Sequence, residues 1–220
     1  MNLNYSVAAP ASDPLHTLNY KLERLPSLSA GMVDSIRCPV IGLARNCTYI
    51  VRAPFDIDFT LDVRTKHVTL GEEIAPEIYE NYITLNRDTW YSPNISFQIT
   101  TSYMFWTDEE VKGNAQLWIH DVPSEIQTEY KNYYVMNGLL PKERLDRIVQ
   151  IPIVMREGES RFVVKRGDPL MAITIIADEK VILTHQEEVP DKVHARSVSK
   201  MAAAKLCPYK YAKNLFSRFF

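Results

Sequence analysis

Residues 56–63 alternate strictly between polar and apolar side chains, and this alternation limits the fold of the chain more than any other feature. The stretch reads Asp-Ile-Asp-Phe-Thr-Leu-Asp-Val. Successive side chains of a β-strand point to opposite faces, so this period predicts a strand with one face in a core and one in water. The outward row would be Asp56, Asp58, Thr60 and Asp62. Such a row offers oxygen ligands to a hard cation, but we interpret it as a solvated sheet face.

The strand signal recurs through most of the chain, interrupted by turn residues. Turn signals such as Lys112-Gly113-Asn114 and Asn137-Gly138 separate short apolar stretches. Short helical turns are expected at 123–130 and 141–147. Many short strands at close spacing predict an all-β fold, either an antiparallel sandwich or a jelly-roll-like one. The predicted strands cover residues 47–53, 66–70, 78–85, 95–101, 115–120, 131–136, 148–155, 161–165, 170–176 and 180–184.

The end of the chain differs from the rest in charge. Residues 191–220 hold seven Lys/Arg and one Asp, whereas the preceding residues hold 18 Lys/Arg against 26 Asp/Glu. We therefore predict three parts: a loosely structured N-terminus (1–17), a β-rich globular domain (18–190) and a basic amphipathic helical tail (191–220). Asp191 can cap the helix of this tail. Its apolar positions would be Val193, Val198, Met201, Ala204 and Leu206.

The tail is predicted to be a docking element, because it mixes cations with aromatic and apolar side chains. It could pack on the acidic body of its own chain, enter a groove of a protein partner or sister subunit, bind nucleic acid, or lie on an anionic membrane. We expect a protein partner or self-association; nucleic acid is a weaker candidate, and a membrane the weakest. The candidate contact residues are Lys205, Tyr209, Lys210, Tyr211, Lys213, Leu215, Phe216, Arg218, Phe219 and Phe220.

No residue pattern predicts a catalytic set, a metal site or a cofactor. The five histidines and three cysteines show no metal-ligand spacing. His120-Asp121 could be a general base beside its orienting acid, but we expect a surface histidine at a strand end. Trp90 with Tyr103, Phe105 and Trp106 would form a set of aromatic residues in loops, or Trp90 and Trp106 would close the ends of a sandwich. A pocket could collect Arg37, Arg52, Arg87, Asp88, Trp90, Arg166 and Asp168.

One local phrase is specific: residues 162–170, Phe-Val-Val-Lys-Arg-Gly-Asp-Pro-Leu, read as a strand, a tight Gly-Asp turn and a second strand. With Ser-Ile-Arg-Cys-Pro at 35–39 and the stretch 48–56, it resembles an uncharacterised family of tailed-bacteriophage proteins, chiefly from marine and cyanobacterial phages. The resemblance covers roughly residues 20–185. It departs at Asn19-Tyr20-Lys21, where family members often carry Trp-Tyr-Lys. The family has no assigned activity, so the resemblance implies a viral origin and a β-rich fold.

These observations predict a non-enzymatic bacteriophage protein that acts by binding, as a virion-associated or assembly component or as a host-interaction factor. We expect it in the host cytoplasm or in the virion, because no signal peptide, long apolar run or CxxC pair is present. The alternative is a jelly-roll protein that binds or hydrolyses nucleotides. A Gly-Asp turn before an apolar strand also resembles the end of the dUTPase-like core, although the Gly-rich segment around the catalytic Asp of those enzymes has no counterpart here.

Overall fold

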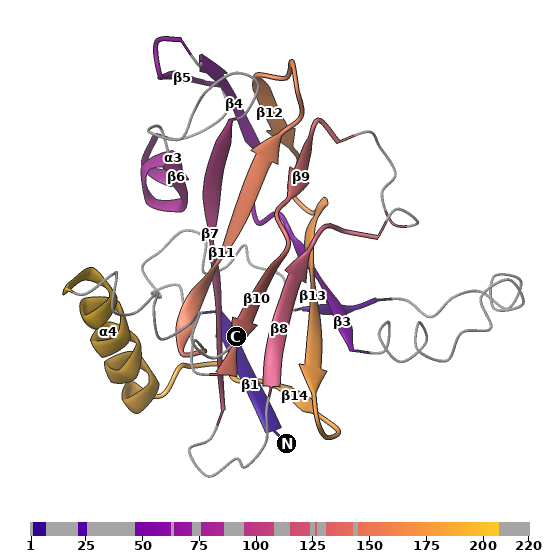
Figure 1. The fold of residues 1–220 in the computed structure, drawn as a ribbon, viewed down its shortest axis with the longest axis vertical. Helices are drawn as coiled ribbons and strands as arrows, with labels where there is room; N and C mark the ends of the chain where they lie inside the picture. The colour runs from indigo at the N-terminus through magenta and orange to yellow at the C-terminus, as the bar shows by residue number, and fades with distance from the viewer. Residues whose placement is uncertain are drawn as a thin grey trace, which may run out of the picture.

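The protein is described by a computed structural model that places residues 2–7, 22–25, 47–62, 64–71, 76–85, 95–107, 115–123, 126, 131–142 and 145–206. These residues form mostly β-strands, arranged in three sheets (Figure 1). Two helices are present in this part of the chain, α3 (Pro76–Tyr82) and α4 (Asp191–Leu206). Neither is long and apolar enough to cross a membrane.

Sheet A is built around the long strand β7 (Ser96–Thr107). On one edge, β7 pairs antiparallel with β11 (Arg147–Met155), which in turn pairs with β9 (Tyr133–Val135). On the other edge, the first part of β7 pairs with β6 (Ile83–Leu85) and the last part with β1 (Asn2–Val7). The only parallel pair among the described strands joins β1 to β14 (Ile182–His185).

Sheet B and sheet C are wholly antiparallel. The order in sheet B is β10 (Gly138–Pro141), β8 (Ala115–His120), β13 (Pro169–Ala177), β3 (Thr48–Arg52) and β2 (Glu23–Arg24). The order in sheet C is β12 (Arg161–Val164), β4 (Ile57–Asp62) and β5 (His67–Leu70).

One apolar cluster joins the inner faces of all three sheets. Sheet A contributes Phe105, sheet B contributes Ile173, and sheet C contributes Phe59 and Phe162. The Phe162 ring lies 5.0 Å from that of Phe97, at an edge-on angle that aromatic pairs prefer. A core enclosed between sheets confirms the predicted fold class: all-β and sandwich- or jelly-roll-like, with a helical C-terminal segment.

The strand predicted from the alternation at residues 56–63 is present as β4. In β4, Ile57, Phe59 and Leu61 are buried, whereas Thr60 and Asp62 are exposed on the opposite face. The alternating pattern predicted this strand correctly because one face of β4 packs in the core and the other faces solvent. Strand β8 also has the predicted bounds, residues 115–120.

One sequence prediction of local structure is wrong, and a second is confirmed only as a single turn. Residues 78–85 were expected to form a strand, but α3 occupies Pro76–Tyr82 and only Ile83–Leu85 is extended. Pro76 favours the helix, because a proline at the first helical position lacks only an N–H that has no helical partner. Residues 141–147 were expected to form a helical turn. Pro141 ends β10 and Arg147 begins β11, but between them Lys142 is in a 3-10 turn, and the Leu145 N–H donates to the Lys142 carbonyl oxygen (3.1 Å).

The prediction of a loosely structured N-terminus is wrong for residues 2–7, which form β1. Leu3 and Tyr5 are buried in the main core, and Ser6 is buried on the other face. The partners of β1 come from residues about 100 and 180 positions later in the chain. Pairing over such a distance leaves no local signal in six residues. Residues 8–17 lie outside the described part, as does most of the helical turn expected at 123–130.

Candidate functional site

The turn between β12 and β13 holds two of the residues predicted to line a pocket, Arg166 and Asp168, and a third, Arg52 of β3, contacts this turn. Gly167 has a φ of 87°, a left-handed conformation that favours glycine. The Lys165 N–H donates to a carboxylate oxygen of Asp168 (2.9 Å), and the Asp168 N–H donates back to the Lys165 carbonyl oxygen (3.0 Å). Asp168 therefore organises its own turn, as acidic residues in turns often do.

The other two pocket residues are bound to the same turn or beside it. The Arg52 guanidinium donates to the Gly167 carbonyl oxygen (2.9 Å) and lies 2.7 Å from the Glu23 carboxylate. The Arg166 N–H donates to the Asp56 carboxylate (2.6 Å). Arg52, Arg166 and Asp168 are thus brought together, with Arg52 and Asp168 engaged by the fold. The remaining candidates, Arg37, Arg87, Asp88 and Trp90, lie outside the described residues.

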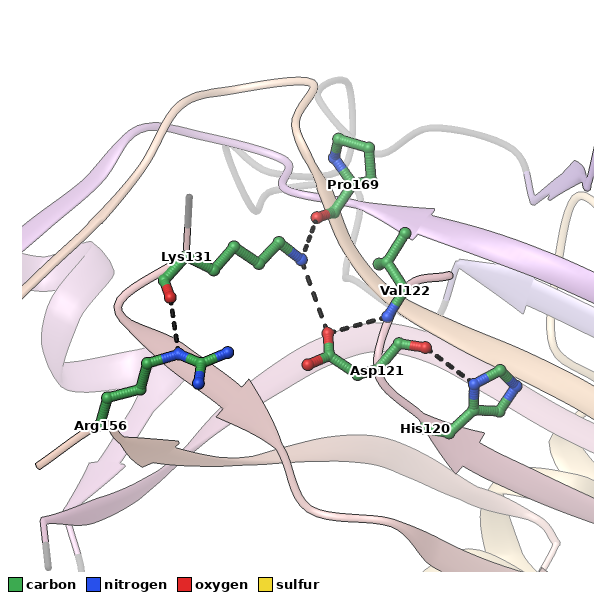
Figure 2. A network of polar contacts seen from close by, with 6 residues as sticks. All are labelled: His120, Asp121, Val122, Lys131, Arg156 and Pro169. Carbon is green, nitrogen blue, oxygen red and sulfur yellow. Dashed lines mark hydrogen bonds and ion pairs between the residues drawn. The ribbon is translucent and has the colours of Figure 1, made fainter. Parts of the chain in front are cut away.

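Lys131 is the residue at this turn that the sequence did not single out. Its side chain is only 13% exposed, and its ammonium donates to the Pro169 carbonyl oxygen at 3.0 Å (Figure 2). The same nitrogen lies 3.7 Å from an Asp121 carboxylate oxygen and 5.1 Å from the centre of the Tyr133 ring. Burial lowers the pKa of Lys131, and the negative charge of Asp121 opposes this effect. We call Asp121, Lys131 and Pro169 the turn clamp.

The turn clamp ties together parts of the chain that are distant in sequence. Asp121 follows β8, Lys131 precedes β9, and Pro169 begins β13. The Val122 N–H donates to the same Asp121 oxygen (2.8 Å), and the Arg156 side chain donates to the Lys131 carbonyl (2.8 Å). Its polar groups are paired with one another, so the clamp is suited to holding strand ends in place. A single lysine before a short strand carries no sequence signal for this role.

His120 is not oriented by the carboxylate of Asp121. Its Nδ1 lies 2.8 Å from the backbone carbonyl oxygen of Asp121, which can only accept, so Nδ1 carries the hydrogen (Figure 2). Nε2 then accepts from the Thr174 hydroxyl (2.8 Å), which lies 2.6 Å from the Thr48 hydroxyl. Burial lowers the pKa of His120 and so favours the neutral ring. The expected surface histidine is instead half-buried in a chain of hydrogen bonds, and the general-base arrangement does not form.

Three large apolar side chains are exposed together on the outer face of sheet B. Leu139 of β10 pairs directly with Trp118 of β8, and Ile176 of β13 lies diagonally next to Trp118, opposite Gln116. Their exposed fractions are 36% for Trp118, 52% for Leu139 and 46% for Ile176. Neighbours at these register positions are close enough to form one patch. We call Trp118, Leu139 and Ile176 the apolar face of sheet B.

The opposite side of the sandwich is covered by helix α4. Val193 is fully buried against Met104 and Trp106, which point outward from β7. The Arg196 guanidinium pairs with the buried Asp146 carboxylate at 3.2 Å. The helix begins at Asp191 as predicted, but the predicted apolar stripe is wrong at Val198, which is 62% exposed. Ser197, one turn after Val193, takes the inward position.

The expected set of aromatic residues in loops is also wrong for three of its members. Tyr103, Phe105 and Trp106 all lie within β7 and are buried, because β7 continues to Thr107. Of the predicted tail contacts, Lys205 belongs to α4, and its side chain is not described. Tyr209, Lys210, Tyr211, Lys213, Leu215, Phe216, Arg218, Phe219 and Phe220 lie outside the described residues.

The carboxylates on the outward face of β4 bind other groups of the same chain. The Asp58 carboxylate pairs with Arg161 at 2.7 Å, and its hydrogen bonds with that guanidinium lower the pKa of Asp58. Asp62 accepts hydrogen bonds from the N–H groups of Arg64 and Thr65. Among the described residues, no group of three or more His, Cys, Asp or Glu side chains could hold a metal ion.

A hollow of about 210 Å³ is lined by residues of β7 and β11 from sheet A and of β8 and β10 from sheet B. Its lining includes Gln98, Leu140, Arg147 and Gln150, close to an irregularity in β11 between Ile148 and Gln150. Ligand pockets are usually larger, about 300–1,000 Å³. The apolar face of sheet B and the anchored α4 are therefore the features on which a binding role can be argued.

Comparison with known proteins adds one distant likeness. No protein-family model matches the chain, and no curated protein does either. The chain is similar to a mutant dUTPase from phage phi11 of S. aureus, whose structure reveals how a structural Mg(II) ion is coordinated. The two share 11% identity over 86% of this chain and 99% of that one, with a TM-score of 0.38. A likeness at this level carries no argument about what this chain does.

Proposed function

We propose that the chain is a non-enzymatic bacteriophage protein that acts by binding, with residues 191–220 as its docking element. It would serve as a virion-associated or assembly component, or as a host-interaction factor, in the host cytoplasm or the particle. The observation that carries the proposal is the anchoring of α4 at its first turns. Val193 packs into the Met104–Trp106 surface, and Arg196 pairs with Asp146.

Because α4 is anchored to the body, the position from which the rest of the tail extends is fixed. The contacts of Val193 and Arg196 fix where α4 leaves the body, and the exposed Val198 indicates that the body covers one side of the helix only. A docking segment held at its base loses less orientational freedom on binding than one attached through a free linker. Its charge also suits a partner with acidic groups, because residues 191–220 carry seven cations and one acid.

The contacts of α4 decide where a truncation should be made. Removing residues 191–220 would uncover Met104 and Trp106, so any effect would mix docking with lost stability. A chain ending at Leu206 keeps the anchor and removes only the aromatic segment. We expect native mass spectrometry to show a defined complex for the full chain, formed by self-association or with a bound protein, and its loss for the 1–206 chain.

Two outcomes would contradict the proposal. One is identical association of the full chain and the 1–206 chain at equal thermal stability. The other is hydrolysis of dUTP with magnesium by the purified protein, which would favour a jelly-roll nucleotide hydrolase. A variant with Arg52→Ala and Asp168→Ala would then show whether the β12–β13 turn carries the activity, since the structure brings these two residues together there.

A further inference from the structure

The two outer faces of the sandwich are treated differently by the chain. Outward residues of β7 in sheet A are covered by α4. On sheet B, Trp118, Leu139 and Ile176 stay exposed on three adjacent strands, with β10 as the edge strand. Contiguous exposed apolar patches on adjacent elements mark interaction sites more often than scattered single residues do.

Three polar side chains beside the apolar face are already hydrogen-bonded within the chain. The Thr48, Thr174 and His120 side chains bond to one another, and His120 also bonds to the Asp121 carbonyl. The centre of the Trp118 ring lies 4.4 Å from that of the His120 ring, and the two rings are tilted by 37°. A partner that covers this face would therefore bury apolar surface without breaking hydrogen bonds, which favours aromatic and aliphatic contacts.

Carboxylates lie at both ends of this face. Asp121 follows β8 and is already paired with Lys131. Asp178 and Glu179 follow β13, with Lys180 after them. A complementary partner would present aromatic side chains with cations between them. Residues 207–220 of this same chain have that composition, with no acid. Their aromatic residues are Tyr209, Tyr211, Phe216, Phe219 and Phe220, and their cations are Lys210, Lys213 and Arg218.

The position of α4 favours docking between two copies. Val193 packs on outward residues of β7, whereas Trp118 and Ile176 are exposed on the outer face of sheet B, across the common core. Figure 1 shows α4 on one side of β7 and strands β8 and β13 on the other. Residues 207–220 follow the end of α4 at Leu206. To reach the apolar face of its own chain, this segment would have to pass around an edge of the sandwich. A second copy can present that face without such a path.

We propose that residues 207–220 of one copy bind the apolar face of sheet B of a second copy. This proposal rests on the proposed docking function and names its partner. Because the tail and the face are different surfaces, the contact is head-to-tail, and it closes into a ring or continues as a chain of subunits. Either arrangement is what an assembly component requires.

The test uses full-length chains and separates the two halves of the contact. The face variant carries Leu139→Asp, and the tail variant carries Phe216→Ser, Phe219→Ser and Phe220→Ser. The matched control is Val163→Asp, because Val163 is 43% exposed on β12 of sheet C, away from the apolar face. Equal melting temperatures for the face and control variants exclude a folding defect.

We expect native mass spectrometry to show an oligomer for the unaltered chain and for the control variant, and monomers for the face variant and the tail variant alone. Mixing the face and tail variants should give a 1:1 complex, since each supplies the half that the other lacks. Leu139→Asp should weaken self-association by at least about tenfold, the loss typical of a contact worth 1.4 kcal/mol.

Three results would overturn the inference. An oligomer that survives Leu139→Asp but not the tail variant would place the tail on another surface, and the docking function would stand. A monomeric unaltered chain would reject the second copy as partner. Melting temperatures lowered equally by the face and tail variants in that monomer would place the tail on its own chain. Identical association of the 1–206 chain and the full chain would reject the docking function itself, as would hydrolysis of dUTP.

Discussion

The outer faces of sheet A and sheet B both carry large apolar side chains, but the described part of the chain covers only those of sheet A. On sheet A, Trp106 and Met104 point away from the core and are nonetheless buried, because Val193 of α4 packs on them. On sheet B, Trp118 points away from the core in the same way and keeps over a third of its surface exposed. A covered face contributes to the stability of one chain, whereas an uncovered face contributes only when something binds it.

The largest expected loss of stability follows from disrupting the packing of α4 on sheet A. Val193→Asp would place a charge without a partner against Met104 and Trp106, and should lower the free energy of unfolding by about 3–5 kcal/mol. Val198→Asp, on the exposed side of the same helix, should change it by less than about 0.5 kcal/mol. Urea denaturation of the two variants measures the difference. Similar losses for both would mean that α4 does not cover sheet A as described.

A smaller effect is expected at the turn clamp, which holds one end of sheet B. Lys131→Met keeps most of the side-chain volume but leaves the Pro169 carbonyl and the Asp121 carboxylate without the ammonium. The unfolding free energy should fall by about 1–3 kcal/mol, the cost of leaving a buried polar group unpaired. Lys165→Met, at an exposed position, is the control. An unchanged midpoint for Lys131→Met would show that the clamp contributes nothing to stability.

The hydrogen-bond chain beneath the apolar face should make stability depend on pH. Burial lowers the pKa of His120 below its ordinary value of 6.5, against the opposing effects of the Asp121 carbonyl and carboxylate. The folded state therefore prefers the neutral ring. The contribution is complete above pH 6.5 and is lost as the pH falls from there through the folded pKa.

Thermal unfolding between pH 8 and pH 4 should show this loss in the unaltered chain, and His120→Gln should reduce the slope. His67→Gln, at an exposed position on β5, is the matched control. A slope that is identical in the unaltered chain and in His120→Gln would contradict the assignment.

The smallest effect is expected at Ile176. Ile176→Ser removes apolar surface that is already half exposed, so the unfolding free energy of the isolated chain should change by less than about 0.5 kcal/mol. Self-association should weaken measurably, because the same side chain is buried when the face is covered. A stability loss of about 2 kcal/mol or more in the monomer would mean that the chain itself covers the apolar face.

Sequence reasoning found the elements whose signals are local. The alternation in β4 and the turn chemistry of Gly167 and Asp168 predicted a strand and a tight turn where both occur. It missed β1, because Leu3 and Tyr5 become core residues only through pairing with β7 and β14. It also misassigned Val198, because which side of α4 faces the body is decided by Met104 and Trp106.

The candidate site was predictable only in part. The composition shows a basic, aromatic end of the chain. The sequence also predicted that Arg52, Arg166 and Asp168 would lie together. The clamp at Lys131 and the patch of Trp118, Leu139 and Ile176 depend on strand register, which places residues from three strands side by side. Register between distant strands is set by the whole core and not by any one segment.

Hydrogen exchange of the β10 and β8 amides tests the central claim most directly, because these strands carry Leu139 and Trp118. The full chain should protect them more than the 1–206 chain does, with equal exchange in β7 beneath α4. That pattern would show that residues 207–220 cover the apolar face of sheet B in the assembled protein. Equal protection of β10 and β8 in both chains would contradict the account.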